Sequence, residues 1–508
     1  MAENNTAEEP VEHPTYMADI RFFFRTVDID HMGAKGIDLG TYDGVKRNRF
    51  AIFAQVSPPD PNMPILDNGE PDVANQWSAA RLATFNNWMT DNCPLGTATP
   101  ATTGETPAPV AAPGARVRKN VDSLGDPEIE LLRKAFSELM ARANPIDQYP
   151  PPEKQSYAWI AGFHGLPGGY CMHHIDGYNP WHRTYLKVME DALRTVDGCE
   201  EVTLPYWDLG PLPEVLQQAP LATYHLATAP GPLDTARNTP AEIADNLSSF
   251  GGPGGVPAQI AKSLKQTLWG RSGVSGYQLY SIQAHDNGHG SIGPTMGNQS
   301  VASYDPIFWF YHCNLDRLWL SWQTKVRATD FTGFRNTLTP QALKFFQSPL
   351  NAMPPWDDGP LVVTTDQTLA FGISYDKLDL GEEDVLENKV GSIDAARSFS
   401  IKSSSPVSVA VKDIDRLSIP GSFVVNLLAD GEPVAQQYFF QPDEPRECAN
   451  CVKNGLVSVQ FHLDQADLLD TKLSVSIEVP SHEGIGTAFP MSQVGNPTIN
   501  ARLLLDDE

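Results

Sequence analysis

The placement of histidines constrains this fold more than any other feature of the sequence. Seven of the 12 histidines fall in two short groups, which are His164, His173, His174 and His182, then His285, His289 and His312. On a helix, residues four apart such as His285 and His289 share one face. Gathered imidazoles suit copper, zinc, iron or nickel. The sequence therefore predicts a chain whose two histidine-bearing regions meet around metal.

The small number of cysteines argues against a structural zinc site. Structural zinc sites are usually closed and contain Cys, but only Cys448 and Cys451 form a C-x-x-C pair among the 6 cysteines. Two groups of three imidazoles, each holding one metal in the core of a helical bundle, favour copper and dioxygen chemistry. From the residues alone, zinc remains an alternative.

Hydrophobic periodicity divides the chain into two regions. Helical spacing predicts helices over 126–145, 181–198 and 315–326. A strand is expected at 16–26, and loops with short helical pieces at 210–275. From about residue 390, alternating segments separated by turns such as Asp430-Gly431 predict a β-sandwich or β-barrel.

We therefore expect two domains. Residues 1–390 form a mainly α domain with long loops, in which the Thr/Ala/Pro-rich stretch 96–114 is a flexible insertion. Residues 391–508 form the β domain, and the boundary is placed between Lys377 and Ser398. A length of 508 residues exceeds what one hydrophobic core normally supports.

Charge and hydropathy exclude several classes of partner. With 36 Lys+Arg against 62 Asp+Glu, the net charge of −26 argues against nucleic acid or an anionic membrane surface. No run of about 18 apolar residues exists, so a membrane span is not expected. The start MAENNTAEEP lacks the features of a secretory signal. The cytoplasm is the expected location, with export alongside a carrier protein as the alternative, and a homo-oligomer (dimer or tetramer) is a further expectation.

Three segments carry a resemblance to a known family. WIAGFHGLP (159–167), GYCMHHIDGYNPWHRTYLKVMEDAL (169–193) and YDPIFWFYHCNLDRLW (304–319) resemble the copper-A and copper-B segments of the tyrosinase/polyphenol oxidase family, the type-3 copper proteins. The resemblance covers roughly residues 15–380 and, more weakly, a C-terminal lid domain as in pro-enzyme forms. It implies a four-helix bundle that binds two copper ions and uses O2 as co-substrate.

The resemblance also implies the roles of individual residues around the metals. Copper A would be held by His164, His173 and His182, and copper B by His285, His289 and His312. His173 is preferred to His174 by its spacing from Cys171, which would form a thioether bond to His173. Phe308 would pack on a copper-B imidazole, and Asp316 would accept a hydrogen bond from an imidazole N–H.

Family membership would make the chain a tyrosinase, which hydroxylates monophenols at the ortho position and oxidises o-diphenols to o-quinones, as in melanin biosynthesis. Small phenols would be its partners. The alternatives are a catechol or o-aminophenol oxidase without hydroxylase activity, and a haemocyanin-like O2 carrier. Asp286 and Asn287, which follow the first copper-B histidine, are the candidate catalytic residues. We expect Asp286, ionised down to about pH 4, or a water that it holds, to take the phenolic proton.

The expected lid contributes two further features. Phe439 and Phe440 are candidates to cover the metals, and strand alternation allows only one of them to point there. We favour Phe439. Cys448 and Cys451 are expected to deliver cuprous ion, with a redox pair or a local disulfide as alternatives.

Overall fold

The computed structural model describes most of residues 9–96 and 331–346, together with 116–142, 156–226, 233–270, 276–329, 372–380, 407–463, 471–480 and 487–503. The predicted insertion at 96–114 lies outside these residues except for Gly96. The predicted domain boundary between residues 377 and 398 lies outside them beyond residue 380.

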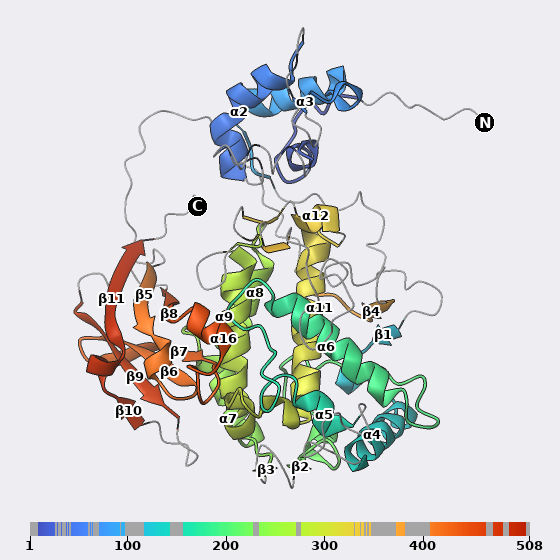
Figure 1. The fold of residues 1–508 in the computed structure, drawn as a ribbon, viewed down its shortest axis with the longest axis vertical. Coiled ribbons are helices and arrows are strands. Elements are labelled where there is room, and N and C mark those ends of the chain that lie inside the picture. The colour runs from blue at the N-terminus through green and yellow to red at the C-terminus, as the bar shows by residue number, and fades with distance from the viewer. Residues whose placement is uncertain are drawn as a thin grey trace.

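Long helices form the centre of the helical domain (Figure 1). They are α6 (Tyr178–Leu193), α9 (Gly276–Ile292) and α11 (Ile307–Lys325), and a fourth long helix, α4 (Asp126–Ala141), lies at the margin. Every residue of α11 from Ile307 to Gln323 is buried, as expected for a helix in the middle of a core. α6 begins before the predicted residue 181, because Pro180 is tolerated in the first turn, where no intrahelical N–H bond is lost. The three predicted helices are confirmed.

The region predicted as loops also contains two helices of ten residues, α7 (Pro240–Ser249) and α8 (Gly255–Leu264), which pack beside α9. α7 starts at a capping box, in which Thr239 accepts the N–H of Glu242 and Glu242 accepts the N–H of Thr239. These helices are the short helical pieces that the sequence predicts within this loop-rich region. The other helical elements there and nearby are α5 (Tyr157–Ala161), η4 (Glu214–Gln217), α10 (Pro294–Gly297), η5 (Ala302–Tyr304) and α12 (Phe331–Arg335).

The predicted strand at 16–26 is wrong. Residues 16–19 form a turn, and η1 (Ile20–Phe23) is a 3-10 helix. The adjacent residues Tyr16 and Met17 are both buried, as are Phe23 and Phe24, whereas Phe22 is exposed, so burial does not alternate as it would in a strand. This segment packs with α2 (Tyr42–Val56), η2 (Val73–Asn75) and α3 (Ala79–Thr90) in a helical unit drawn in blue at the top of Figure 1.

The C-terminal region forms two antiparallel sheets, as predicted. One sheet has the order β10-β9-β6-β7 and the other β11-β5-β8. The strands are β5 (Val407–Asp415), β6 (Phe423–Ala429), β7 (Glu432–Phe439), β8 (Leu456–Leu463), β9 (Leu473–Val479), β10 (Thr487–Phe489) and β11 (Gly495–Leu503). Inward-facing residues of both sheets share one apolar core, so the arrangement is a β-sandwich. The short helical elements η6 (Arg416–Ser418), α16 (Ala449–Lys453) and η8 (Met491–Gln493) connect its strands.

The sandwich lies against the helical domain at strand β7. β7 is an edge strand that pairs with β6 alone in its sheet, and its other edge faces α9 (Figure 1). Elsewhere, short strand pairs tie distant segments together: β1 (Arg116–Arg118) pairs in parallel with β4 (Ile373–Tyr375), and β2 (His225–Leu226) pairs with β3 (Leu233–Asp234). The predicted class, a mainly α domain with long loops plus a C-terminal β domain, is confirmed.

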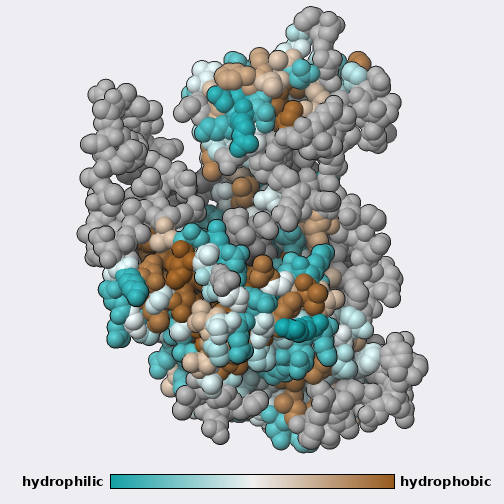
Figure 2. All heavy atoms as spheres, turned by 60° about the vertical axis from the view of Figure 1, so that its left-hand side comes forward, coloured by the Kyte–Doolittle hydropathy of each residue, from teal (hydrophilic) through white to brown (hydrophobic). Residues whose placement is uncertain are grey.

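The surface on the side of the sandwich mixes hydrophilic residues with separate hydrophobic patches (Figure 2). Within the described part of the chain, no helix combines the length and apolar character that crossing a membrane requires.

Candidate metal centre

Six buried histidines meet between the central helices. α6 carries His182, α9 carries His285 and His289, α11 carries His312, and the loops between α5 and α6 carry His164 and His173. Each of these side chains is at most 6% exposed. The two groups that are far apart in the sequence are therefore brought together in one cluster.

The ring nitrogens of the cluster point at one another. The Nε2 atoms of His164 and His173 are 3.3 Å apart, and those of His289 and His312 are 3.0 Å apart. His312 also belongs to a group with His164 and His182, and to a group with His285 and His289, in each of which the ligand atoms lie within 4.8 Å of one another. The two predicted triads thus adjoin, and His312 lies between them.

In three of the histidines, a neighbouring oxygen atom binds Nδ1, so that Nε2 faces the cluster. The Nδ1 atom of His182 lies 2.8 Å from the carbonyl oxygen of Tyr178, and that of His289 lies 2.7 Å from the carbonyl oxygen of Met296. The Nδ1 atom of His285 lies 2.8 Å from Oδ1 of Asp286. These acceptors place the proton on Nδ1 and leave the lone pair of Nε2 for a metal.

Two of these Nε2 atoms support the presence of a metal directly. Those of His182 and His285 are buried and have no hydrogen-bond partner among the described residues. An unpaired buried nitrogen is costly unless it binds something. An all-imidazole donor set of this kind fits copper.

The protonation state of the cluster also suits a metal. Burial lowers the pKa of His182 and of His289 to about 3. Burial, followed by repulsion from neighbouring histidines, lowers the pKa of His164, His173, His285 and His312 well below the ordinary value. All six rings are therefore neutral at pH 7, which is the form that binds metal.

His173 rather than His174 enters the cluster, in agreement with the predicted preference. The backbone of His174 has φ +58°, and its ring turns away toward the C-terminal domain. There its Nε2 atom lies 3.1 Å from the carbonyl oxygen of Phe440, and its ring stacks on Phe439 at a centroid distance of 4.3 Å.

Cys171 and Phe308 lie beside the cluster. The Sγ atom of Cys171 is within 4.8 Å of the ligand atoms of His164 and His173 and accepts a hydrogen bond from Nε2 of Gln299 at 3.0 Å. Cys171 is a free thiol, whose pKa burial raises to about 12, so the thioether bond to His173 stays a prediction. The ring of Phe308 stacks on His312 with centroids 4.0 Å apart.

Phe440, not the favoured Phe439, covers the cluster. Its ring stacks on His289 at a centroid distance of 4.0 Å and lies 5.3 Å from His173 and 5.5 Å from His285. Phe439 points the other way, into the sandwich, where it stacks on Phe423 at 4.8 Å. Only one of the two rings faces the cluster, as strand alternation predicts, but the prediction that it is Phe439 is wrong.

The contacts of Asp286 differ from those expected of a free base. Its Oδ1 atom faces His285, and its Oδ2 atom accepts the backbone N–H of Phe440 at 3.2 Å. Burial raises the pKa of Asp286 well above its ordinary value, although the Phe440 N–H and the positive charge of Arg416 lower it. The premise that this carboxyl stays ionised down to about pH 4 is therefore wrong for this closed form.

Asn287, the other candidate catalytic residue, binds the C-terminal domain. Its Nδ2 atom donates to Oε1 of Gln259 at 2.8 Å and to Oε1 of Gln437 at 3.1 Å, and its Oδ1 atom accepts the N–H of Tyr438 at 2.7 Å. Asn287 thus holds strand β7 in place.

The predicted bond from Asp316 to an imidazole is not found among the described residues. Oδ1 of Asp316 instead accepts Nε of Arg183 at 2.6 Å, and Oδ2 accepts the hydroxyl of Tyr375 at 2.6 Å. Arg183 follows the histidine of α6, and Asp316 lies one turn after His312 on α11. The ion pair therefore joins two histidine-bearing helices without touching a ring nitrogen.

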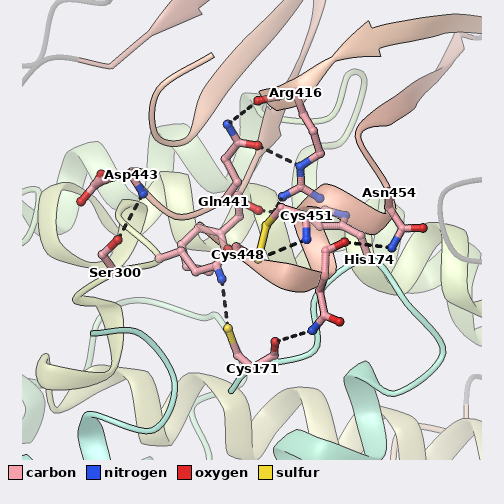
Figure 3. The surroundings of a disulfide bond; sticks show 12 residues. Cys171, His174, Ser300, Arg416, Gln441, Asp443, Cys448, Cys451 and Asn454 are labelled. Carbon is pink, nitrogen blue, oxygen red and sulfur yellow. Dashed lines mark hydrogen bonds between the residues drawn. A yellow bond between two sulfur atoms is a disulfide. The ribbon is translucent and has the colours of Figure 1, made fainter. Parts of the chain in front are cut away.

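Cys448 and Cys451 form a disulfide, as one of the predicted alternatives states. It lies beside the loop that carries Cys171 (Figure 3). The guanidinium of Arg416 donates to Sγ of Cys451 at 3.4 Å, and Nδ2 of Asn450 donates to the carbonyl oxygen of Cys171 at 3.4 Å. A disulfide has no thiolate to bind cuprous ion, so copper delivery would need the reduced pair.

Two residues near the site were not predicted from the sequence. Gln437 joins the C-terminal domain to Asn287 and Gln259, and the positive charge of Arg416 lowers the pKa of Asp286. Arg416 is buried and donates to Oε1 of Gln441 at 3.0 Å, as Figure 3 shows. Their partners lie far away in the chain, so no local pattern marks either residue. His174 was considered only as a metal ligand, and its contact with Phe440 could not be inferred from its neighbours.

Comparisons with known proteins place this cluster in a family. Residues 154–230 and 232–325 match the family Tyrosinase, described as the common central domain of tyrosinase. A hemocyanin of Enteroctopus dofleini is 29% identical over 232 residues, which is 42% of this chain and 17% of that protein. Tyrosinase HcTyr1 of a Hahella strain is 32% identical over 175 residues, which is 30% of this chain and 37% of that protein. The chain thus spans well under two thirds of these relatives.

A solved structure shows the same fold. Oxygen-bound pro-tyrosinase of Aspergillus oryzae, a variant, superposes with a TM-score of 0.55 at 15% identity, covering 77% of this chain and 95% of that chain. These matches show that residues 154–230 and 232–325 carry the common central domain of tyrosinase, with relatives among both the tyrosinases and the hemocyanins.

Proposed function

We propose that this protein is a tyrosinase, which uses two copper ions and O2 to hydroxylate monophenols at the ortho position and to oxidise o-diphenols to o-quinones. The observation that carries the proposal is the cluster of six buried, neutral imidazoles. When bound, copper supplies the exchange of electrons with O2, while the protein supplies ligands, shape and the exclusion of water. Relatives of both kinds match the chain, a tyrosinase at 32% identity and a hemocyanin at 29%, so the O2-uptake test below decides between enzyme and carrier.

The protein's own groups hold the imidazoles ready. Backbone carbonyls fix the rings of His182 and His289, and Asp286 fixes the ring of His285. Phe308 packs flat against His312 and keeps water from that side of the cluster. Such preorganisation lowers the cost of reaching the reactive geometry.

The C-terminal domain is proposed to be a lid that keeps the protein latent. Phe440 occupies the space in which an aromatic substrate would meet His289. The amides of Asn287, Gln259 and Gln437 bond one another across the interface and hold β7 there. A phenol can reach the cluster only after the ring of Phe440 is displaced or removed.

Deprotonation of the phenol is a separate question, because a phenol has a pKa of about 10. Both oxygens of Asp286 already accept N–H groups, so we propose that Asp286 positions His285 rather than taking the phenolic proton. Asp286→Leu tests this role. It should lower monophenol and diphenol turnover together, whereas a selective loss of monophenol turnover would restore Asp286 as the base.

The proposal is tested by loading the purified chain with copper, counting copper per chain, and recording O2 uptake with a monophenol and with catechol before and after limited proteolysis. We expect two copper ions per chain and uptake with both substrates that rises after cleavage. Uptake with catechol alone would indicate a catechol oxidase. Reversible O2 binding without consumption of either substrate would indicate a carrier.

A further inference from the structure

The main chain of Phe440 is held at both of its polar groups by the helical domain. Its N–H donates to Oδ2 of Asp286 at 3.2 Å, and its carbonyl oxygen lies 3.1 Å from Nε2 of His174. These two side-chain atoms are themselves 3.4 Å apart. In extended backbone, the N–H and C=O of one residue point to the same side, so a neighbouring pair of groups can bind both.

The same side of the segment is bound at two earlier residues. The N–H of Tyr438 donates to Oδ1 of Asn287 at 2.7 Å, and the carbonyl oxygen of Gln436 accepts the N–H of Gly251 at 2.7 Å. Residues 436, 438 and 440 alternate along the strand, so their polar groups line one edge. On the helical domain, the groups that bind this edge of β7 belong to Gly251, Asn287, Asp286 and His174. We call these four residues of the helical domain the binding edge.

The binding edge is built for close approach of a peptide. Gly251 has φ +94°, and a Cβ atom there would lie 2.4 Å from Gln259 and 2.8 Å from Asn287. A side chain at this position would therefore push the amides of the interface apart. The open edge of β7 finds on the helical domain one main-chain N–H and three side chains that take the place of the partners a neighbouring strand would supply.

At its C-terminal end, the bound segment places the ring of Phe440 over the histidines. Phe440 is the residue whose main chain is bound twice, and its ring stacks on His289 at 4.0 Å. An extended peptide that binds at a sheet edge is held in the same way. Its main-chain hydrogen bonds give affinity, and a side chain in a pocket gives specificity.

We propose that, once β7 leaves, the binding edge takes an extended peptide in its place, so that the preferred substrates are tyrosyl residues within peptides or proteins. The tyrosyl side chain occupies the position of the Phe440 ring, and the residues before it lie along Gly251 and Asn287. This inference rests on the proposed phenol oxidation and names its substrate class.

The test uses the full chain with Gln437→Glu, which places a carboxylate among buried amides and so favours the open form. O2 uptake is compared for p-cresol and for an acetylated pentapeptide of glycine and serine that ends in tyrosine amide. Both substrates need the open form, so the fraction of open protein cancels from the ratio of their kcat/KM values. We expect a ratio of at least about tenfold in favour of the peptide, from several main-chain bonds.

Variants of the binding edge identify the cause of the preference. In the Gln437→Glu background, Asn287→Ala and His174→Ala should each reduce the ratio about fivefold or more, mainly through KM of the peptide. Tyr280→Phe is the matched control, because Tyr280 contacts His462 of β8 at 3.0 Å, away from the edge of β7. It should leave the ratio unchanged.

A binding measurement separates this inference from the proposed function. The same pentapeptide with phenylalanine in place of tyrosine is titrated calorimetrically into metal-free Gln437→Glu protein. Binding that Asn287→Ala weakens supports the binding edge even if neither phenol is oxidised, in which case the proposed function alone fails. No binding of this peptide, or a kcat/KM ratio near one that the edge variants do not change, would overturn the inference.

Discussion

The ring of Phe440, from the C-terminal domain, lies parallel to the imidazole of His289 on α9, with centroids 4.0 Å apart and an angle of 20° between the planes. Together with the contacts of the same ring with His173 and His285, this stacking joins the lid to the histidine cluster. Phe440 is completely buried, so the approach of any aromatic substrate from this side requires its removal or displacement.

Phe440→Ala in the full chain should therefore raise catechol oxidation several-fold without proteolysis, because it leaves a cavity over His289 large enough for a small ring. The same change should lower the free energy of unfolding by about 3 kcal/mol, the usual cost of truncating a buried Phe. O2 uptake by the copper-loaded protein and urea unfolding measure the two effects.

Phe439→Ala is the matched comparison, since Phe439 belongs to the core of the sandwich. It should cost similar stability and give a smaller gain in turnover. If Phe439→Ala activates the protein and Phe440→Ala does not, the assignment of the covering residue is reversed.

The histidine cluster could be predicted from the sequence because long local motifs carry it. Each motif fixes one turn of helix or one loop, so His182, His289 and His312 were identified from neighbours close in the chain. The long helices and the alternating strands were predictable for the same reason, because periodicity is local.

Other features depend on contacts between distant segments and could not be predicted. Which of Phe439 and Phe440 faces the histidines depends on the register of β7, in which Phe439 pairs with Phe423. Asp316 meets Arg183, which precedes it by 133 residues, and nothing near Asp316 reveals that partner. Burial likewise decides the pKa of Asp286, and burial is a property of the whole fold.

Acid should destabilise the metal-free protein through its buried histidines. Burial lowers the pKa of His182 in the folded protein from 6.5 to about 3, so the unfolded chain binds more protons between these values and stability falls as the pH falls. From pH 7.5 to 5.5, one such histidine costs about 1.4 kcal/mol of unfolding free energy.

Urea unfolding of metal-free protein at the two pH values measures this loss. His182→Gln removes the titration while keeping a side chain of comparable polarity, so its unfolding free energy should fall by about 1.4 kcal/mol less over the same interval. Equal pH dependence in both proteins would contradict a neutral, buried His182.

The ion pair between Arg183 and Asp316 should be critical for stability rather than for binding metal. Their side chains are 1% and 3% exposed, and removing one partner of a buried pair leaves an uncompensated charge at a cost of about 3–5 kcal/mol. Asp316→Ala should lose about that much in urea unfolding. Asp191→Ala is the control, because Asp191 is 41% exposed and each of its pairs with Lys187 and Arg116 is worth about 0–1 kcal/mol.

Copper per folded chain distinguishes this role from the predicted contact with an imidazole. Asp316→Ala protein that remains folded at low temperature should bind as much copper as the unchanged chain. A loss of one copper ion from folded protein would indicate that Asp316 acts on a ligand ring.

The redox state of Cys448 and Cys451 should decide whether they take part in copper loading. The pair forms a disulfide in the structure, and cuprous ion needs thiolate ligands. If the pair delivers copper, metal-free protein that has been reduced should load several-fold faster from a cuprous thiol complex than oxidised protein. The Cys448→Ser, Cys451→Ser variant should load at the slow rate with or without reduction. Equal loading of the oxidised and reduced chains would leave the disulfide as a local cross-link beside the loop of Cys171.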